Sequence, residues 1–328
     1  GNSNGSNCGY GAGTQWGNVT GGHKQGKNVI ATANITSTDA IAPSSSRGPA
    51  ADGRIKPDLA AVGTSVYSTI DSHTYGNKTG TSMSAPGVAG YFAVLHNAFD
   101  ELQQDTAEAG LLKAIAMNTA DDLGNPGPDF IYGYGRVNAR KALKVIQDTQ
   151  FLSSSITTND TLTYTISIPA GVNKFSAMLY WTDKEASTSA SKALVNNLDF
   201  EVTDLTGATT YQPWVLDPTP NTTTLLYGAT RGVDTLNNVE QVTLDAPNSG
   251  DYRFTVYGTN IPQGPQTFYI VYAMDIEKNP ISFPHKDAKL VPGANYVRWN
   301  GATSLTWEYS TDSMSTWTSV GLSATGGN

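Results

Sequence analysis

The spacing of apolar residues along the chain changes near residue 150. Before that point, short β-branched runs at 28–35 and 66–70 are followed by segments with apolar residues three and four apart, at 106–118 and 139–148. The first pattern is typical of buried strands, and the second of helices with one apolar face. Because strands that alternate with helices form parallel sheets, residues 1–149 are predicted to form an α/β domain with a largely parallel sheet.

From residue 150 onward, apolar and polar residues alternate in short runs that are separated by Gly, Asn, Asp and Pro. These runs are 162–168, 175–181, 198–202, 239–244, 252–257 and 268–272. Alternation with period two is typical of strands with one buried face, and the segment contains no run of helical spacing. Residues 150–278 are therefore predicted to form an all-β sandwich without helices.

The last fifty residues have a weaker pattern. Strands are predicted at 294–299 and 305–310, and residues 310–317 resemble an Asp-box hairpin, with Met314 where glycine is usual. This length is too short for a complete sandwich. Residues 279–328 are therefore expected to be an incomplete Ig-like or fibronectin-like β module.

Composition narrows the classes of partner. The chain has 328 residues, enough for two or three domains, and a net charge of -8. An acidic surface argues against nucleic acid and anionic membranes as partners. We expect no membrane span, because the sequence has no uninterrupted apolar window of about 18 residues. The single cysteine, Cys8, cannot form an internal disulfide and is expected to be structural.

The most informative string is Gly-Thr-Ser-Met-Ser-Ala-Pro-Gly-Val-Ala-Gly at 80–90. It predicts a serine, Ser82, at the tip of a turn before a helix that runs from about Val88 to Phe99. Pro86 is expected in the first helical turn, where its missing N–H has no intrahelical partner. An isolated serine at such a place is usually a helix cap, which is the structural alternative.

The whole string, however, resembles the nucleophile motif of the subtilisin-like serine peptidases (subtilases, peptidase family S8), Gly-Thr-Ser-Met-(Ser/Ala)-x-Pro, with Ser82 as the nucleophile. Residues 44–63 and 132–143 resemble two further stretches of that catalytic domain. The resemblance implies a partial subtilisin-like fold in residues 1–149 and a serine endopeptidase that cleaves polypeptide substrates through an acyl-enzyme. In the stretch 44–63, Lys56 and Asp58 are expected to be scaffold residues.

The resemblance also places Asn2 at the asparagine that stabilises the oxyanion, because this residue lies in a Gly-Asn pair well before the serine motif. An amide side chain suits that role, since it donates an N–H without adding a titrating group. The structural alternative is an ordinary turn asparagine.

The family also needs an aspartate and a histidine, in motifs that would precede Asn2, and neither motif is found. The four histidines are His23, His73, His96 and His285. At about 1.5 Å of rise per residue, His96 lies roughly 20 Å along the helix from Ser82. We therefore expect the serine-bearing part of a subtilase, without the upstream part of its catalytic domain and inactive alone.

The second half has a resemblance of its own. Residues 193–199, 237–240 and 262–268 resemble the jelly-roll domain that follows the catalytic domain in certain secreted bacterial alkaline subtilases. This resemblance implies a secreted or cell-surface protein. The expected chemistry needs no cofactor.

Hard oxygen ligands in this half suggest structural calcium, which prefers six to eight oxygens. The residues that supply such oxygens are Asp183, Asn196, Asn197, Asp199, Asp234, Asn237 and Asn238. The metal candidates chosen from them are Asp183, Asp199, Asp234 and Asn237. The alternative is that these side chains bind backbone groups in turns.

Two other functions stay open. A subtilase-derived pseudoenzyme would lack catalysis, and its β-sandwich domains would bind protein, polysaccharide or a cell surface. A carbohydrate-binding module would explain residues 150–328 but would leave the Ser82 motif without a cause.

Overall fold

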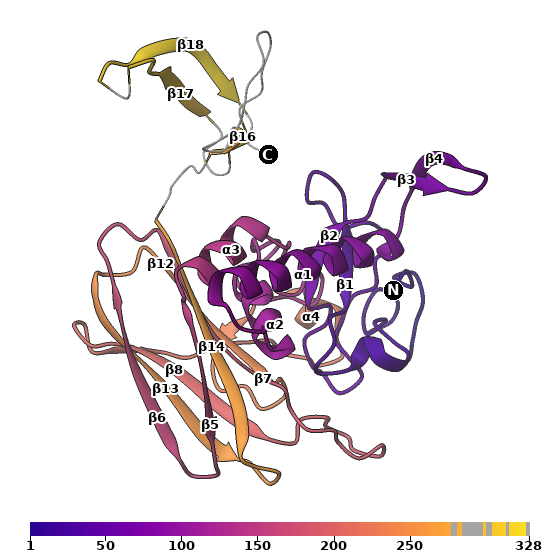
Figure 1. The fold of residues 1–328 in the computed structure, drawn as a ribbon. Helices are drawn as coiled ribbons and strands as arrows, with labels where there is room; N and C mark the ends of the chain where they lie inside the picture. The colour runs from indigo at the N-terminus through magenta and orange to yellow at the C-terminus, as the bar shows by residue number, and fades with distance from the viewer. Residues whose placement is uncertain (277–280, 284–297, 300–303, 313–314, 326–328) are drawn as a thin grey trace.

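The computed structural model describes residues 1–276, 281–283, 298–299, 304–312 and 315–325. The protein is a mixed structure of helices and sheets (Figure 1). Its helical part, residues 1–149, is called the N-terminal lobe below. This lobe lies against two layered sheets, residues 150–276, which are called the sandwich (Figure 1).

The N-terminal lobe is built around a short parallel pair of strands. Strand β1 (Thr32–Ile35) pairs with β2 (Leu59–Val62) in parallel. Helix α1 (Thr81–Gln103) packs on this pair, and α2 (Ala109–Asn118) and α3 (Ala139–Gln147) pack against α1 and against strands of the sandwich. The remaining elements are the 3₁₀ turn η1 (Gly22–Gln25) and the strands β3 (Val66–Ile70) and β4 (Thr74–Lys78).

The predicted helices and strands of this lobe are present, but the predicted sheet is smaller than expected. Among the described strands, only β1 and β2 are paired in parallel. Strands β3 and β4 form an antiparallel hairpin that projects from the lobe (Figure 1). The expectation of a largely parallel sheet is therefore wrong for the described chain, whose sheets are mostly antiparallel.

The sandwich consists of two four-stranded antiparallel sheets. Their strand orders are β12-β7-β14-β5 and β6-β13-β8-β9. The strands are β5 (Phe151–Ile156), β6 (Thr161–Ile168), β7 (Lys174–Trp181), β8 (Asn197–Asp204), β9 (Thr209–Tyr211), β12 (Val239–Asp245), β13 (Gly250–Asn260) and β14 (Gln266–Asp275). All six predicted strands are confirmed, whereas the jelly-roll classification stays a prediction.

Alternation explains how these strands form their core. In β6, Leu162, Tyr164 and Ile166 pack against the apolar core, while the threonines between them are exposed. Fully buried aromatic residues from both sheets, such as Phe175 and Phe254, fill the space between the layers. Because every second side chain of a strand points to the same face, the apolar residues of both sheets meet between the layers and form the core of the sandwich.

The connection between β9 and β12 contains the elements that were not predicted. These are β10 (Trp214–Val215), the helix α4 (Thr222–Leu226) and β11 (Thr230–Arg231). The expectation that this half has no helix is therefore wrong. The physical reason is a cap: the Asn221 side chain accepts hydrogen bonds from the N–H groups of Thr223 and Thr224, which starts a single helical turn.

Beyond the sandwich, the described elements are short antiparallel pairs: β15 (Ile281–Phe283) with β16 (Arg298–Trp299), and β17 (Ser304–Tyr309) with β18 (Thr318–Thr325). In the turn before β18, the Asp312 carboxylate accepts hydrogen bonds from Thr316 N (2.8 Å) and Thr316 Oγ1 (2.6 Å). Most of the predicted strand at 294–299 lies outside the described residues. The Ig-like or fibronectin-like module stays a prediction.

The N-terminal lobe and the sandwich share one apolar core. Leu112 and Ile115 of α2 belong to the same buried cluster as Tyr180 of β7 and Tyr269 and Val271 of β14. Because α2 lies against the outer face of this sheet, the sheet is covered on both sides. At residue 150 the chain thus changes from helices to strands, but the apolar core continues across this point.

A buried ion cluster reinforces this contact. The Asp58 carboxylate lies 2.5 Å from Lys56 Nζ and 3.0 Å from Lys113 Nζ, and all three side chains are almost fully buried. It also accepts a hydrogen bond from Ala31 N at 2.7 Å. The Lys113 ammonium lies over the ring of Tyr180 at 5.4 Å, so the cluster joins α2, the entry to β1 and the sandwich. Lys56 and Asp58 are therefore structural, as predicted.

We predict that Asp58→Asn lowers the free energy of unfolding by about 3–5 kcal/mol, because it leaves two buried ammonium groups without a charge partner. Burial alone would raise the pKa of Asp58, but Lys113 and Lys56 hold it below its ordinary value. The stabilisation is therefore present at neutral pH and lost as the pH falls through the folded pKa. Urea unfolding at pH 7 measures the effect.

The matched control is Asp148→Asn, which breaks the exposed pair between Lys144 and Asp148. This pair should contribute less than about 1 kcal/mol. Equal losses in the two variants would contradict the structural role assigned to Asp58.

Candidate active site

Ser82 is the second residue of α1 and its side chain is exposed. The helix begins at Thr81, seven residues earlier than the apolar pattern indicates, so the serine lies within the first turn and not before it. The N–H groups of a first turn lack intrahelical acceptors and carry the positive end of the helix dipole. Ser82 Oγ is therefore beside an environment that favours negative charge.

The early start of the helix also corrects the predicted place of Pro86. It is the sixth residue of α1 and lies inside the helix, not in its first turn. Its nitrogen faces the carbonyl oxygen of Ser82, four residues back, and has no hydrogen to donate. The helix continues past Pro86 because only this one backbone hydrogen bond is lost. The side chains of Ser84 and Val88, on either side of the proline, are buried and hold the helix in place.

Asn2 contacts the same turn, although 79 residues separate the two segments. Its side-chain oxygen accepts hydrogen bonds from Thr81 N at 3.0 Å and from Thr81 Oγ1 at 3.2 Å. Fixing the oxygen in this way leaves the amide nitrogen of Asn2 free to donate. In the described part of the chain, the N–H of Ser82 has no acceptor either. Two donors thus lie next to the serine, and the second was not anticipated from the sequence.

The end of β2 holds this turn in place. Gly63 directly follows β2, and its carbonyl oxygen accepts a hydrogen bond from Gly80 N at 2.9 Å. A Cβ at Gly63 would lie 2.1 Å from Ser84 Oγ and 2.6 Å from the Gly80 carbonyl. Only glycine fits, and the close contact fixes the start of α1 against the parallel strands. In the sequence, the signal for this close contact is the pair Val62-Gly63, which follows an apolar run.

No described histidine or carboxylate forms a hydrogen bond with Ser82. His96 lies 3.2 Å from Asp100, one turn further along the exposed side of α1. His23 lies in η1, and His73 in the turn between β3 and β4. His285 lies outside the described residues. Within the described chain, no histidine or carboxylate is therefore within hydrogen-bond contact of this serine.

The four calcium candidates differ in what their oxygens bind. Asp183 accepts from Lys27 Nζ at 2.6 Å and from the N–H groups of Val195 (2.8 Å) and Asn196 (2.9 Å). An ammonium group and two amides therefore already bind this carboxylate. It acts as an anchor between the N-terminal lobe and the sandwich.

Asp234 and Asn237 bind each other and the backbone. Asp234 accepts from the N–H groups of Leu236 and Asn237 and from the Asn237 side-chain amide. Asn237 Oδ1 accepts from Ile55 N at 2.9 Å. Both fit the turn alternative better than a metal site.

Asp199 is different, because its Oδ1 atom is buried without a donor. Its other oxygen accepts from Thr259 Oγ1. The described residues contain no group of three or more His, Cys, Asp or Glu that could hold a metal ion. Calcium at the four sequence-derived positions stays a prediction.

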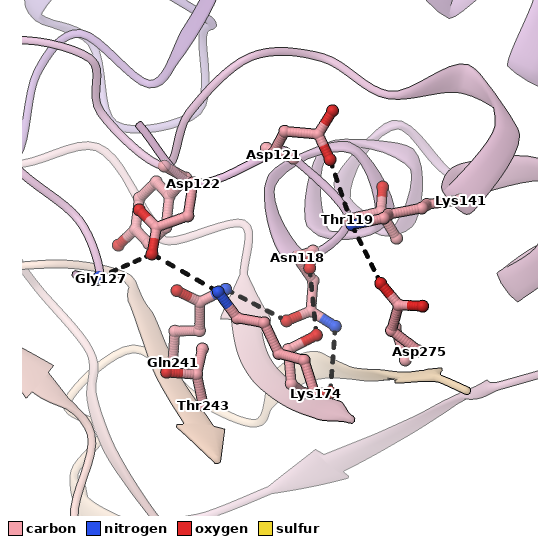
Figure 2. A pocket seen from close by; sticks show the side chains of 14 residues that line it. Asn118, Thr119, Asp121, Asp122, Gly127, Lys141, Lys174, Gln241, Thr243 and Asp275 are labelled. Carbon is pink, nitrogen blue, oxygen red and sulfur yellow. Dashed lines mark hydrogen bonds and ion pairs between the residues drawn. The ribbon is translucent and has the colours of Figure 1, made fainter. Parts of the chain in front are cut away.

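A polar pocket of about 220 Å³ lies where the N-terminal lobe meets the sandwich (Figure 2). Lys141 lies 3.1 Å from Asp121 and 3.4 Å from Asp275, and Lys174 lies 3.5 Å from Asp122. Each ammonium group thus faces carboxylates. The serine motif does not line this pocket, which is a polar seam between the two parts.

Two other sequence expectations can be compared with the structure. Cys8 is a free, exposed thiol. Among the described helices, none has the length and apolar character that crossing a membrane requires.

The chain is similar in sequence to known proteases. The model of the subtilase family matches residues 1–135. A Dictyostelium discoideum protein named serine protease/ABC transporter B family protein tagD is 25% identical over 310 residues, which cover 70% of this chain and 17% of that protein. The extracellular serine protease of Serratia marcescens is 46% identical over 69 residues, 21% of this chain and 6% of its own length.

The minor extracellular protease Vpr of Bacillus subtilis is 37% identical over 115 residues, 32% of this chain and 14% of its own length. The chain thus spans less than a fifth of each of these relatives. Among solved structures, a lanthipeptide protease is 27% identical, with a TM-score of 0.32, and the match covers 36% of this chain and 41% of that one. The family match and the named relatives confirm the resemblance predicted from the Ser82 motif: residues 1–135 of this chain are similar to the subtilase family.

Proposed function

We propose that this chain carries the nucleophile and the oxyanion site of a subtilase serine endopeptidase. Ser82 Oγ attacks the carbonyl carbon of a peptide bond, the amine leaves, and water then hydrolyses the acyl-enzyme. The observation that carries the proposal is the contact between Asn2 and Thr81, which brings an amide donor beside an exposed serine in the first turn of α1.

The negative oxygen of the tetrahedral intermediate is stabilised by two donors, the side-chain amide of Asn2 and the backbone N–H of Ser82. Because the oxygen of Asn2 is held by Thr81, its nitrogen is oriented before substrate arrives. Donors that are fixed in advance cost no reorganisation during the reaction. The N-terminus of α1 adds favourable electrostatic potential at the same place. No cofactor enters this chemistry.

A serine without a base is a weak nucleophile at neutral pH. The aspartate and histidine of the triad are therefore proposed to come from polypeptide outside the described residues, namely the upstream part of the catalytic domain. The exposed face of α1 supports a protein partner there. Ala85, Ala89, Ala93 and Val94 are exposed, and no Asp, Glu, Lys or Arg lies between Lys78 and Asp100. Exposed helix faces normally carry charge.

The whole protein is proposed to be a secreted protease that acts on polypeptides, with the sandwich as its jelly-roll domain. Two of the relatives are named as extracellular proteases, which supports secretion. The match to the Dictyostelium protein covers 70% of this chain, which is more than the N-terminal lobe alone. The lobe and part of the sandwich thus have counterparts in one serine protease.

The first test is covalent labelling by a fluorophosphonate, which reacts with activated serines. We predict no labelling of the 328-residue chain, and rapid labelling of a chain that also includes whatever residues precede Gly1 in its gene. The control is Ser82→Ala in the longer chain, which should abolish labelling without changing the circular dichroism spectrum. If neither chain is labelled, the protein is a pseudoenzyme and the proposal is wrong.

The second test concerns the oxyanion donor. Asn2→Asp keeps an oxygen that can accept from Thr81 but removes the N–H that stabilises the oxyanion. In the longer chain, kcat should fall about 10²–10³-fold with little change in KM, the loss known for the equivalent change in subtilisin, a member of this family. Peptide hydrolysis at pH 8 measures both constants. A loss confined to KM would show that Asn2 only binds substrate.

The third test concerns the exposed face of α1. Ala89→Glu places a charge on it and should change the free energy of unfolding of the 328-residue chain by less than about 0.5 kcal/mol. In the longer chain it should strongly reduce fluorophosphonate labelling, because a charge would be buried against the upstream part. Thr188→Glu, in an exposed loop, is the control and should leave labelling intact. Normal labelling of both variants would show that this face is not covered.

A further inference from the structure

The outer strands of the sandwich differ in how they are protected from other chains. The two sheets have four edges: β12 and β5 in one sheet, and β6 and β9 in the other. An edge strand has one row of backbone N–H and C=O groups without a strand partner, and this row can pair with another polypeptide. Native proteins normally prevent such pairing by edges that are short, charged, irregular or covered.

Three of the four edges have such protection. Strand β9 has only three residues. Strand β12 is covered in part by the β10–β11 pair, from which Trp214 donates its indole N–H to Thr243 Oγ1 at 2.8 Å and Arg231 donates to the backbone carbonyl of Thr243. Strand β5 is covered at its start by the N-terminal lobe, because the ring of Phe151 packs on that of Phe99 in α1 at 5.5 Å.

Strand β6 (Thr161–Ile168) has none of these features. Its eight residues include no charged residue, no proline and no glycine. It pairs with β13 in a regular register over its whole length, without a bulge. Within the part of the chain that the structure describes, no other strand pairs with it. The strand is therefore a long, regular and uncharged edge whose outer backbone groups lack a strand partner.

The side chains of β6 are also incompletely covered. Leu162 and Tyr164 pack against the apolar core, yet both are only partly buried. Their cross-strand partners on β13, Val256 and Phe254, are 0% exposed. The apolar face of β6 thus remains in contact with water along its open side. A further strand beside β6 would remove this apolar surface from water, which is favourable.

We propose that β6 is an interface between two copies of this chain. The two β6 strands pair in the antiparallel direction about a two-fold axis, so that the β6-β13-β8-β9 sheets of both copies join into one continuous sheet. Backbone hydrogen bonds between the two strands supply the affinity, as in other cases of strand addition. The interface is independent of the proposed peptidase function.

The charge of the chain favours a second copy as the occupant of this edge. The net charge is -8, so two copies repel each other over much of their surface, whereas β6 is uncharged. The order of side chains is self-complementary as well. Threonine recurs at residues 161, 163 and 165, on the exposed face. A register that keeps both cores on the same side of the joined sheet places threonine opposite threonine, a pair that stabilises neighbouring strands.

The first measurement is the molar mass of the 328-residue chain, by light scattering after size exclusion, over a series of concentrations. We expect the mass to rise from 34.7 kDa toward twice that value. Hydrogen exchange at the lowest and highest concentrations then locates the interface. Exchange at residues 161–168 should be slower in the dimer, because outer N–H groups donate to the second copy. A monomer at every concentration, or a dimer protected only elsewhere, would overturn the proposal.

The variant that tests the edge is Thr163→Lys. Each dimer would contain two such lysines near the two-fold axis, so the dissociation constant should rise at least about tenfold. The matched control is Thr209→Lys, which adds the same charge to β9, the opposite edge of the same sheet, at an exposed position. It should leave the dissociation constant unchanged.

The melting temperature of the monomer, measured at low concentration, separates a lost interface from a lost fold. Both variants should melt close to the unaltered chain, because both positions are exposed. An unchanged dissociation constant for Thr163→Lys would contradict the proposal. Equal weakening by both lysines would contradict it too, since the effect would then be one of overall charge and not of pairing through β6.

Discussion

The packing of the N-terminal lobe against the sandwich is organised around one buried carboxylate, Asp58. It binds the ammonium groups of Lys56 and Lys113 and the backbone of Ala31, and the three ionised side chains are almost completely withdrawn from water. Charges are tolerated in such a place only when geometry and hydrogen bonding are nearly complete. Lys113 meets these conditions by donating also to the carbonyls of Lys27 and Val29. As a result α2, the entry to β1 and the sandwich have a single mutual arrangement.

The candidate active site inherits its rigidity from this arrangement. Asp58 immediately precedes β2, which ends at Val62, and Gly63 then fixes the first turn of α1. Asn2, which is 79 residues away in the sequence, contacts the same turn. The serine and its proposed oxyanion donors are therefore attached to a strand end that is anchored in the core, which suits groups that must act without rearranging.

The sequence predicted the elements better than their ends and contacts. Alternation located all six strands of the sandwich, because one face of each strand packs on the core. The same kind of reasoning missed the start of α1, since Ser84 and the small residues around Pro86 lack an apolar stripe and the turn is held by contacts with Gly63 and Asn2. Likewise, no local pattern shows that Lys27, 156 residues away, neutralises Asp183. Long-range donors decide which carboxylates are available for a metal.

The same argument explains why the family motif points to Ser82 as the proposed nucleophile but does not point to its base. A serine motif is local, and the proposed oxyanion donors follow from one turn and one asparagine. A base is non-local: it has to be brought to Ser82 by packing, and the described histidines are held elsewhere, His96 by Asp100. The uncharged face of α1 is where such a contact would form. Covering the alanine and valine side chains that this face exposes to solvent would be favourable, because it removes apolar surface from water. Activation of the serine and burial of this face are thus expected to be one and the same event.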